Sequence, residues 1–197
     1  MYSAGQPGEA KALFAFTSPP LEYQRQNVEQ QKQLLAGAFA GQQWEIPRLL
    51  ACMPDAPDFY FDSMSQIHMS SWSNGRVALV GDAAYCPSPA SGQGTGLALV
   101  GAYVLAGELA AAGDYCTAYA RYEAEVRGYV EQNLSLGQKM AKEMVPASHL
   151  QIWFRNQMMR ALPYLPWKGL ITKGILEPLQ KAANAITLKD YPATRST

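Results

Sequence analysis

The order of apolar and polar residues in the first 75 positions predicts alternating strands and helices. Residues 10–16 form a short apolar run that predicts a strand, which ends at the turn sequence TSPP. Residues 24–40 carry apolar side chains at helical spacing among Gln, Glu and Lys, and residues 44–53 predict a short helix with a proline in its first turn. Apolar residues then recur at roughly every second position, so residues 58–72 predict one long antiparallel strand.

The middle of the chain has continuous apolar stretches instead. Residues 76–80 read RVALV and are bounded by turn residues on both sides. A short run of this kind is typical of a parallel strand that is buried on both faces. The helix that follows, at residues 92–112, is apolar on nearly every face, so we expect it to be buried as well.

The C-terminal half is predicted to be helical. Asp114 can cap a long helix that reaches about Met144, with Pro146 beyond its end. Two further amphipathic helices are predicted at residues 150–162 and 169–186. With the strands described above, this order of elements predicts an α/β protein that leans towards the α+β class.

Charge is balanced over the whole chain but not along it. Sixteen basic and sixteen acidic residues give a formal net charge of zero, which argues against a general nucleic-acid binder. Residues 1–145 carry nine Lys/Arg and fourteen Asp/Glu (−5), whereas residues 146–197 carry seven and two (+5). The basic C-terminal part either docks on an acidic partner or membrane surface, or neutralises the body of its own protein.

The cysteine and histidine positions point to a reducing compartment and predict no metal site. The three cysteines form no C-x-x-C pair, and the N-terminus has no signal-peptide pattern, so we expect a soluble cytoplasmic protein. The two histidines are far apart in the sequence. The longest apolar run, residues 97–112, contains Glu108 and is shorter than the ~18 residues that a membrane span needs.

One acidic residue, Asp82, lies just beyond the predicted strand 76–80. Ligands of open α/β sheets bind beyond the carboxyl ends of the strands, and an ionised carboxylate only accepts hydrogen bonds. Asp82 therefore suits the hydroxyls of a ribose or ribityl chain and would repel a phosphate. Glycines at the start of the next helix let a flat ring approach the free amides of its first turn; they are Gly92, Gly94 and Gly96. Alternatively, these glycines only permit tight packing.

The sequence GDAAYCPSPASGQGTGLAL resembles the second flavin-binding motif of the FAD-dependent aromatic hydroxylases, the p-hydroxybenzoate hydroxylase type of the FAD-binding monooxygenase family. The resemblance is most specific over residues 76–109. It implies that Asp82 binds the ribityl or ribose part of FAD and that Pro89 lies beside the isoalloxazine ring. It also implies that the amides of Thr95 and Gly96 face the pyrimidine edge of the flavin. The implied cofactor-binding residues are Gly81, Asp82, Pro89, Gly92, Gly94, Thr95 and Gly96.

Three positions depart from the family motif. Tyr85 stands where the family usually has His, Ser88 replaces the first proline of the loop, and Gly96 stands where Asn is common. None of these changes removes the carboxylate or the backbone donors. Each is a candidate for altering flavin affinity or reactivity.

The first flavin-binding motif of the family has no counterpart in this sequence. No G-x-G-x-x-G cradle for the pyrophosphate follows a strand, and no Asp-Gly dipeptide occurs. We therefore expect part of a Rossmann-like FAD domain, with an antiparallel substrate sheet and C-terminal helices, whose N-terminal Rossmann unit is missing. The expected regions are a partial substrate-domain sheet at 1–72, the second FAD-binding motif at 73–112 and a helical region at 113–197. Such a half would fold by pairing with another copy or with a separate N-terminal chain.

The resemblance implies a monooxygenase that uses FAD, NAD(P)H and O₂ to hydroxylate an aromatic or polyketide-like substrate. Because the flavin carries the chemistry, we assign no catalytic side chain. The candidate substrate-binding residues on the predicted strand 58–72 are Phe59, Phe61 and His68, and core packing is the alternative role. Two other functions stay open: an inactive remnant that does not bind FAD stably, and a docking module for a membrane or partner built on the basic C-terminal helices.

Overall fold

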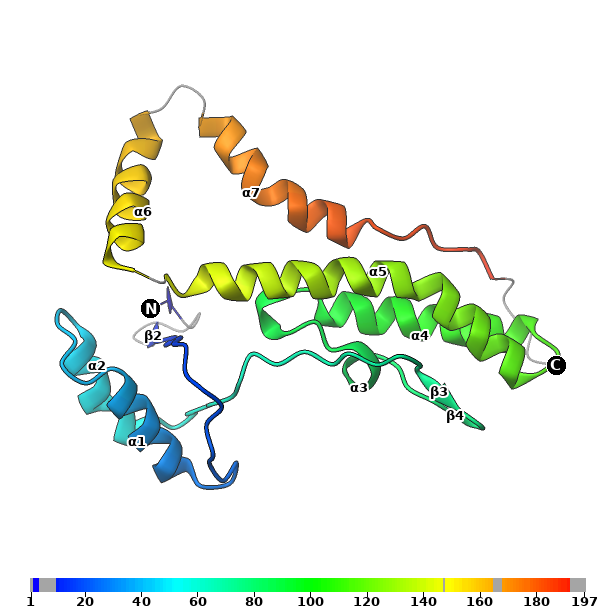
Figure 1. The fold of residues 1–197 in the computed structure, drawn as a ribbon, viewed down its shortest axis with the longest axis horizontal. Helices are drawn as coiled ribbons and strands as arrows, with labels where there is room; N and C mark the ends of the chain where they lie inside the picture. Colours follow the sequence, from blue (N-terminus) through cyan, green and yellow to red (C-terminus); the bar gives the residue numbers. More distant parts are fainter. Residues whose placement is uncertain (1, 4–9, 147, 165–167, 192–197) are drawn as a thin grey trace. The chain divides into compact units, whose positions relative to one another are not determined.

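The computed structural model describes residues 2–3, 10–146, 148–164 and 168–191, and the chain divides into two compact units at residues 63 and 64. The described residues are mostly helical and include two small antiparallel sheets of two strands each (Figure 1). This content confirms the predicted α/β class with its α+β leaning. The division into regions 1–72, 73–112 and 113–197 stays a prediction.

The first unit contains a two-stranded ladder and two helices. Its elements are β1 (Tyr2–Ser3), β2 (Ala10–Lys11), α1 (Val28–Ala38), α2 (Ile46–Cys52) and the short 3₁₀ helix η1 (Met53–Asp55). The two helices fall where the sequence predicts them, and the side chain of Asn27 caps α1 by accepting from the N–H of Gln30. The predicted strand 10–16 was too long, because only its first two residues pair with β1.

The predicted strand at residues 58–72 is wrong: the structure assigns no strand to these residues. A strand exists only where a neighbouring strand accepts and donates its backbone hydrogen bonds. In the described part of the chain this segment meets no such ladder. Its backbone joins other segments through single hydrogen bonds: the Ile67 N–H donates to the carbonyl of Cys86 at 3.1 Å, and the carbonyl of Trp72 accepts from the Leu79 N–H at 2.8 Å.

The second unit begins with a hairpin instead of the expected parallel strand. β3 (Ser73–Asn74) and β4 (Val77–Ala78) pair antiparallel around Gly75, whose φ is +57°. Val77 is 62% exposed, so the prediction that residues 76–80 are buried on both faces is wrong. A parallel strand needs sheet neighbours and covering helices, and the described residues supply β4 with a single partner.

Helices make up the rest of the second unit. They are α3 (Asp82–Tyr85), η2 (Pro89–Ser91), α4 (Gly94–Ala111), α5 (Tyr115–Met144), α6 (His149–Ala161), η3 (Leu162–Tyr164) and α7 (Lys168–Ala183). α4 and α5 lie side by side, and α7 also contacts α5 (Figure 1). Asp114 caps α5 as predicted, because its carboxylate accepts from the Thr117 N–H at 2.9 Å.

Only one face of α4 is buried, so the prediction of an all-round buried helix is wrong. Leu97 and Val104 are almost fully buried, whereas Leu99 is 68% exposed and Tyr103 and Leu109 are also exposed. By length and composition α4 could cross a membrane. Its packing on α5 shows instead a helix that contributes one face to a folded core.

An aromatic cluster forms the centre of this core. Trp72 lies 4.6 Å from Tyr85 and 5.6 Å from Tyr122 between ring centroids, and all three side chains are buried. The Tyr122 hydroxyl donates to the carbonyl of Leu79 at 3.1 Å, so the Tyr85 hydroxyl is the donor in its 3.0 Å contact with Tyr122. Gly101 makes room for Tyr85, because a Cβ at this position would lie 1.9 Å from the Tyr85 hydroxyl oxygen.

The segment after α7, which contains Lys189 and Tyr191, packs on α4. Glu108 is buried on α4, and it accepts a hydrogen bond from the Tyr191 hydroxyl at 2.8 Å and an ion pair from Lys189 at 3.4 Å. A Cβ on Gly107 would lie 2.3 Å from the Tyr191 ring, so glycine is required there. Burial and the Glu108 carboxylate together raise the pKa of Tyr191 to about 12. Lys189 thus supplies one instance of the basic C-terminal part neutralising its own body.

Candidate flavin-binding site

The turn between β4 and α3 places Asp82 at the surface. Gly81 has a φ of +67°, a conformation that L side chains rarely adopt, and a Cβ there would lie 3.2 Å from the Cβ of Ala98 on α4. The Gly81 carbonyl accepts from the N–H groups of Ala84 and Tyr85, both at 3.0 Å. α3 therefore starts immediately at Asp82, and the carboxylate of Asp82 is exposed.

The loop before α4 leaves the N-terminus of that helix open. Ser88 has a φ of +76° and its side chain accepts from the Ala90 N–H, while Gly92 adopts the left-handed conformation. Gln93, the residue before α4, makes no side-chain cap. The backbone N–H groups of the first turn therefore have no capping side chain and stay available as donors.

The Asp82 carboxylate and the open helix N-terminus are neighbours. The Asp82 Oδ1 lies 3.7 Å from the position that a Cβ on Gly94 would occupy. Two residues further along, a Cβ on Gly96 would lie 3.6 Å from the Tyr129 hydroxyl oxygen. An acceptor-only carboxylate thus stands beside free backbone donors, so one ligand can offer hydroxyls to the first and a carbonyl or partial anion to the second.

The structure brings the seven predicted cofactor-binding residues together in one short stretch. All of them lie between positions 81 and 96 of the second unit, and the side of this stretch that carries Asp82, Pro89, Gly92 and Thr95 is exposed. Their individual roles stay predictions. Among the described residues no cluster of three or more His, Cys, Asp or Glu side chains could hold a metal ion.

Two of the three departures from the family motif, Tyr85 and Ser88, have structural contacts. Tyr85 points into the aromatic core rather than to the surface, and Ser88 is buried with its side chain bonded to the loop. The Ser88 carbonyl also accepts from the buried Ser91 hydroxyl at 3.0 Å, so a second hydrogen bond forms within the loop. These contacts hold the loop between α3 and α4 in shape without the usual His and Pro.

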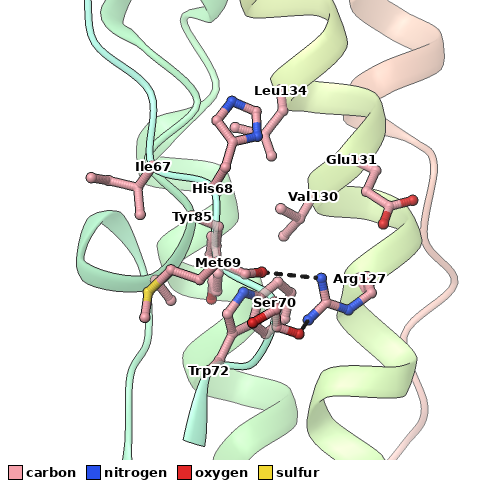
Figure 2. Close-up of a pocket in the computed structure, with 11 residues that line it drawn as sticks. Ile67, His68, Met69, Ser70, Trp72, Tyr85, Arg127, Val130, Glu131 and Leu134 are labelled. Carbon is pink, nitrogen blue, oxygen red and sulfur yellow. Dashed lines mark hydrogen bonds between the residues drawn. The ribbon is translucent and has the colours of Figure 1, made fainter.

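A pocket of about 230 Å³ lies between residues 67–72, α3 and α5 (Figure 2). His68, a predicted substrate-binding residue, lines it together with Tyr85 and the α5 residues Arg127 and Glu131. His68 is therefore placed at a cavity, although it does not lie on a strand. Its role in binding substrate stays a prediction.

Arg127 holds the lower wall of the pocket in place. Its guanidinium donates to the carbonyl of Ser70 at 3.0 Å and stacks 4.7 Å from the ring centre of Trp72 (Figure 2). It also pairs with Glu123, which accepts from the Trp72 N–H at 3.0 Å. Burial opposes ionisation of Glu123, but the hydrogen bonds from Trp72 and Arg127 outweigh it and lower the pKa of that carboxyl.

The other two predicted substrate-binding residues belong to the first unit. Phe61 packs against Tyr23 with ring centroids 5.2 Å apart and also contacts Phe16. Phe59 lies under the ammonium of Lys32, at 5.8 Å from the ring centre. Each ring thus has a packing partner within its own unit, and a substrate contact for either stays a prediction.

Sequence reasoning missed two residues beside the pocket, Gln66 and Gly137. Gln66 donates to the carbonyl of Pro87 at 3.0 Å and to that of Leu134 at 2.7 Å. A Cβ on Gly137 would lie 2.1 Å from the same Pro87 oxygen. A glycine on the buried face of a long helix was the available signal, because glycine weakens a helix unless a close approach requires it.

The chain is similar to known proteins in sequence and in structure. Residues 60–155 match the FAD binding domain family. The chain is 48% identical over 193 residues to a flavin-dependent monooxygenase of Legionella longbeachae, covering 98% of this chain and 46% of that protein. It is 42% identical to tetracycline destructase Tet(55), with a TM-score of 0.66 over 84% of this chain and 41% of that structure, and 35% identical to Tet(51), also at 0.66, over 89% and 43%.

The chain spans less than half the length of the curated relatives it matches, from 36% to 46% among the first of them. The match to the family includes the Gly-Asp turn, the loop and both helices α4 and α5. The resemblance inferred from residues 76–109 is thereby confirmed, together with FAD as the cofactor of the family. Over residues 60–155 the chain is therefore similar to the FAD-binding monooxygenases, and it corresponds to a part of the length that these relatives have.

Proposed function

We propose that this chain supplies the ribityl and pyrimidine side of the FAD site in a flavin-dependent monooxygenase that uses NAD(P)H and O₂. The observation that carries the proposal is the placement of the Asp82 carboxylate beside the uncapped N-terminus of α4. The chain's residues fit this part of the cofactor, because a Cβ at Gly94 would occupy the space beside the carboxylate. When bound and reduced, FAD supplies the activation of O₂ and the transfer of one oxygen atom to the substrate.

Each part of the site has a separate task in this proposal. Asp82 accepts hydrogen bonds from the hydroxyls of the ribityl or ribose part, and the amides of Thr95 and Gly96 donate to the pyrimidine edge of the flavin. Pro89, at the exposed start of η2, lies beside the ring and helps to keep water from it. The side chains therefore bind and orient the cofactor, while none acts as a nucleophile.

The substrate that we propose is an aromatic or polyketide-like molecule. Two solved relatives are named tetracycline destructases, and tetracycline is a fused-ring polyketide with phenol and enol hydroxyls. The pocket between residues 67–72, α3 and α5 combines aromatic side chains with His68 and Arg127, which suits a ring that carries hydroxyls. A cytoplasmic location fits the three free cysteines.

A second proposal concerns assembly. The outer face of α4 exposes Leu99 and Leu109, and β4 exposes Val77. Contiguous apolar patches and strand edges seldom stay uncovered on a soluble protein. We infer that a second copy or a separate chain with the remainder of the family's length covers this face, and that without it the chain binds FAD weakly or not at all.

A chimaera tests the flavin site. This chain replaces the matched 193-residue stretch of the Legionella longbeachae monooxygenase, and FAD binding is followed by quenching of flavin fluorescence. We expect a yellow protein in which Asp82→Ala weakens FAD binding by about tenfold or more, since a hydrogen bond to a charged group is lost. The matched variant Asp55→Ala, at another exposed carboxylate, leaves binding unchanged. A folded chimaera that is colourless, or that binds FAD equally well with and without the Asp82→Ala substitution, contradicts the proposal.

A further inference from the structure

Gln66 lies where three segments meet, one of which is the loop of residues 86–93 between α3 and α4, called the flavin loop below. Its Nε2 lies 3.0 Å from the carbonyl oxygen of Pro87, in that loop, and 2.7 Å from the carbonyl oxygen of Leu134, on α5. Its Oε1 lies 3.1 Å from Nε2 of His68. One part-buried amide thus connects the loop, α5 and the wall of the pocket.

Chemistry fixes the orientation of this amide. Both neighbours of the amide nitrogen are carbonyl oxygens, which only accept hydrogen bonds. Turning the Gln66 amide around would point its oxygen at two other oxygens and leave its NH₂ group facing His68. The amide NH₂ group therefore faces Pro87 and Leu134, and Oε1 is the atom that faces the imidazole.

The fixed amide also fixes the tautomer of His68. Because Gln66 Oε1 only accepts, His68 Nε2 must donate, and a neutral imidazole then has no hydrogen on Nδ1. His68 lines the pocket of about 230 Å³ together with Trp72 and Tyr85. A neutral His68 therefore has one remaining hydrogen-bonding atom, Nδ1, and that atom is an acceptor.

The packing around Pro87 gives independent evidence for a fixed junction. Ile67 follows Gln66 in the chain, and Cys86 precedes Pro87. The Ile67 N–H donates to the carbonyl of Cys86 at 3.1 Å, so a backbone hydrogen bond lies next to the Gln66 contact. Gly137 lets α5 approach closely, since a Cβ there would lie 2.1 Å from the Pro87 oxygen and 3.0 Å from Gln66 Nε2. Backbone and side-chain contacts thus converge on two adjacent peptides of the flavin loop, those of the Cys86 and Pro87 carbonyls.

We propose that Gln66 is a positioning residue: it locks the flavin loop onto α5 and holds His68 as the Nε2–H tautomer, so that Nδ1 accepts a hydrogen bond from a hydroxyl of the substrate. The substrate class is then an aromatic or enolic molecule with a free hydroxyl near the flavin. This inference deepens the proposed function and rests on it for the identity of the substrate. The interlock of Gln66, His68 and the loop can be measured without flavin.

The first test reads the tautomer directly. The chain has two histidines, so a His149→Gln background leaves a single imidazole for ¹⁵N NMR. We expect the neutral His68 to show a protonated Nε2 and an unprotonated Nδ1. Gln66→Met, which keeps the length but removes the amide, is expected to give a mixture of tautomers, and the exposed control Gln138→Met is expected to change nothing. A protonated Nδ1 in the parent, or a tautomer unaffected by Gln66→Met, overturns the proposal.

The second test measures the stability of the flavin loop and the binding of a hydroxyl group to His68. In Gln66→Met, hydrogen exchange of the Ile67 and Ser91 amides is expected to accelerate by about tenfold for the lost hydrogen bonds. Phenol is expected to shift the His68 Nδ1 resonance of the parent, and anisole, which cannot donate, is expected to leave it in place. Equal shifts from both probes, or from neither, overturn the acceptor role, and unchanged exchange overturns the lock. Neither result depends on FAD, so a failure here is distinct from a failure of the flavin-binding chimaera.

Discussion

The close approach of Tyr85 to Gly101 leads to a prediction with a definite sign. In Gly101→Ala the new Cβ would lie 1.9 Å from the Tyr85 hydroxyl oxygen and 3.3 Å from Cγ2 of Val80. The Tyr85 ring has little room to withdraw, because Trp72 packs against it at 4.6 Å and Tyr122 holds its hydroxyl. The substitution therefore overpacks a full core.

The magnitude follows from three contributions. Alanine in place of glycine within a helix stabilises by about 1 kcal/mol. Overpacking costs about 1–3 kcal/mol, and loss of the hydrogen bond between Tyr85 and Tyr122 costs about 1 kcal/mol more. We expect Gly101→Ala to lower the free energy of unfolding by about 1–3 kcal/mol, measured by urea unfolding with circular dichroism at 222 nm.

Two variants make this prediction specific to the contact. Tyr85→Phe removes the oxygen that the new Cβ would meet, so in that background Gly101→Ala is expected to cost about 1–2 kcal/mol less. Gly128→Ala, at a helical glycine of α5 with no atom within 4 Å of the added Cβ, is expected to stabilise by about 0.5–1 kcal/mol. If Gly101→Ala stabilises as Gly128→Ala does, the close contact that we describe is absent.

Three further predictions follow from the same structure. Ala102 is exposed on the same face of α4 as Leu99, so in the Leu99→Lys background, which leaves this face uncovered, Ala102→Leu should change the free energy of unfolding by less than about 0.5 kcal/mol; a larger loss in urea unfolding would contradict the exposure of this position. The isolated chain should sediment above its 21.5 kDa mass and be colourless, with Leu99→Lys shifting it towards the monomer; a compact monomer would contradict the exposed-face argument. The folded pKa of Glu123 lies below its ordinary value of 4.5, so its contribution to stability is present above pH 4.5 and is lost as the pH falls through the folded pKa. Glu123→Gln should therefore weaken the fall of the unfolding temperature in acid, measured by thermal unfolding. An unchanged fall would refute the network with Arg127 and Trp72.

The helices could be predicted from sequence because their signals are local. The apolar spacing of α1 and α5 and the Asp114 cap depend on residues within a few positions of one another, and the structure confirms them. The strands could not, since pairing depends on partners elsewhere: residues 58–72 alternate as a strand does and pair with none. The sequence also could not predict which face of α4 is buried, because a helix that is apolar on nearly every side does not show which side packs on α5.

The candidate site divides in the same way. The neighbourhood of Asp82 and Gly94 lies within a motif of a few residues, so the sequence alone predicted it. The contacts of Gln66 join positions that are 21 and 68 residues apart, and no spacing rule connects them. Residue types that look ordinary in the sequence, a glutamine and a mid-helix glycine, acquire a role only once the fold places them together.

The anchoring of the last described segment has a consequence for how the protein is made. The carboxylate of Glu108 is buried in the folded chain, where it pairs with Arg121 on α5 at 4.0 Å and with Lys189 and Tyr191, which follow it by 81 and 83 residues. During synthesis α4 and α5 leave the ribosome first, and the Glu108 carboxylate then has Arg121 beside it but lacks its contacts with Lys189 and Tyr191. The helix pair therefore reaches its final packing only after residue 191 has been made, and a nascent chain that stalls before residue 189 should be recognised by chaperones or proteases as incomplete.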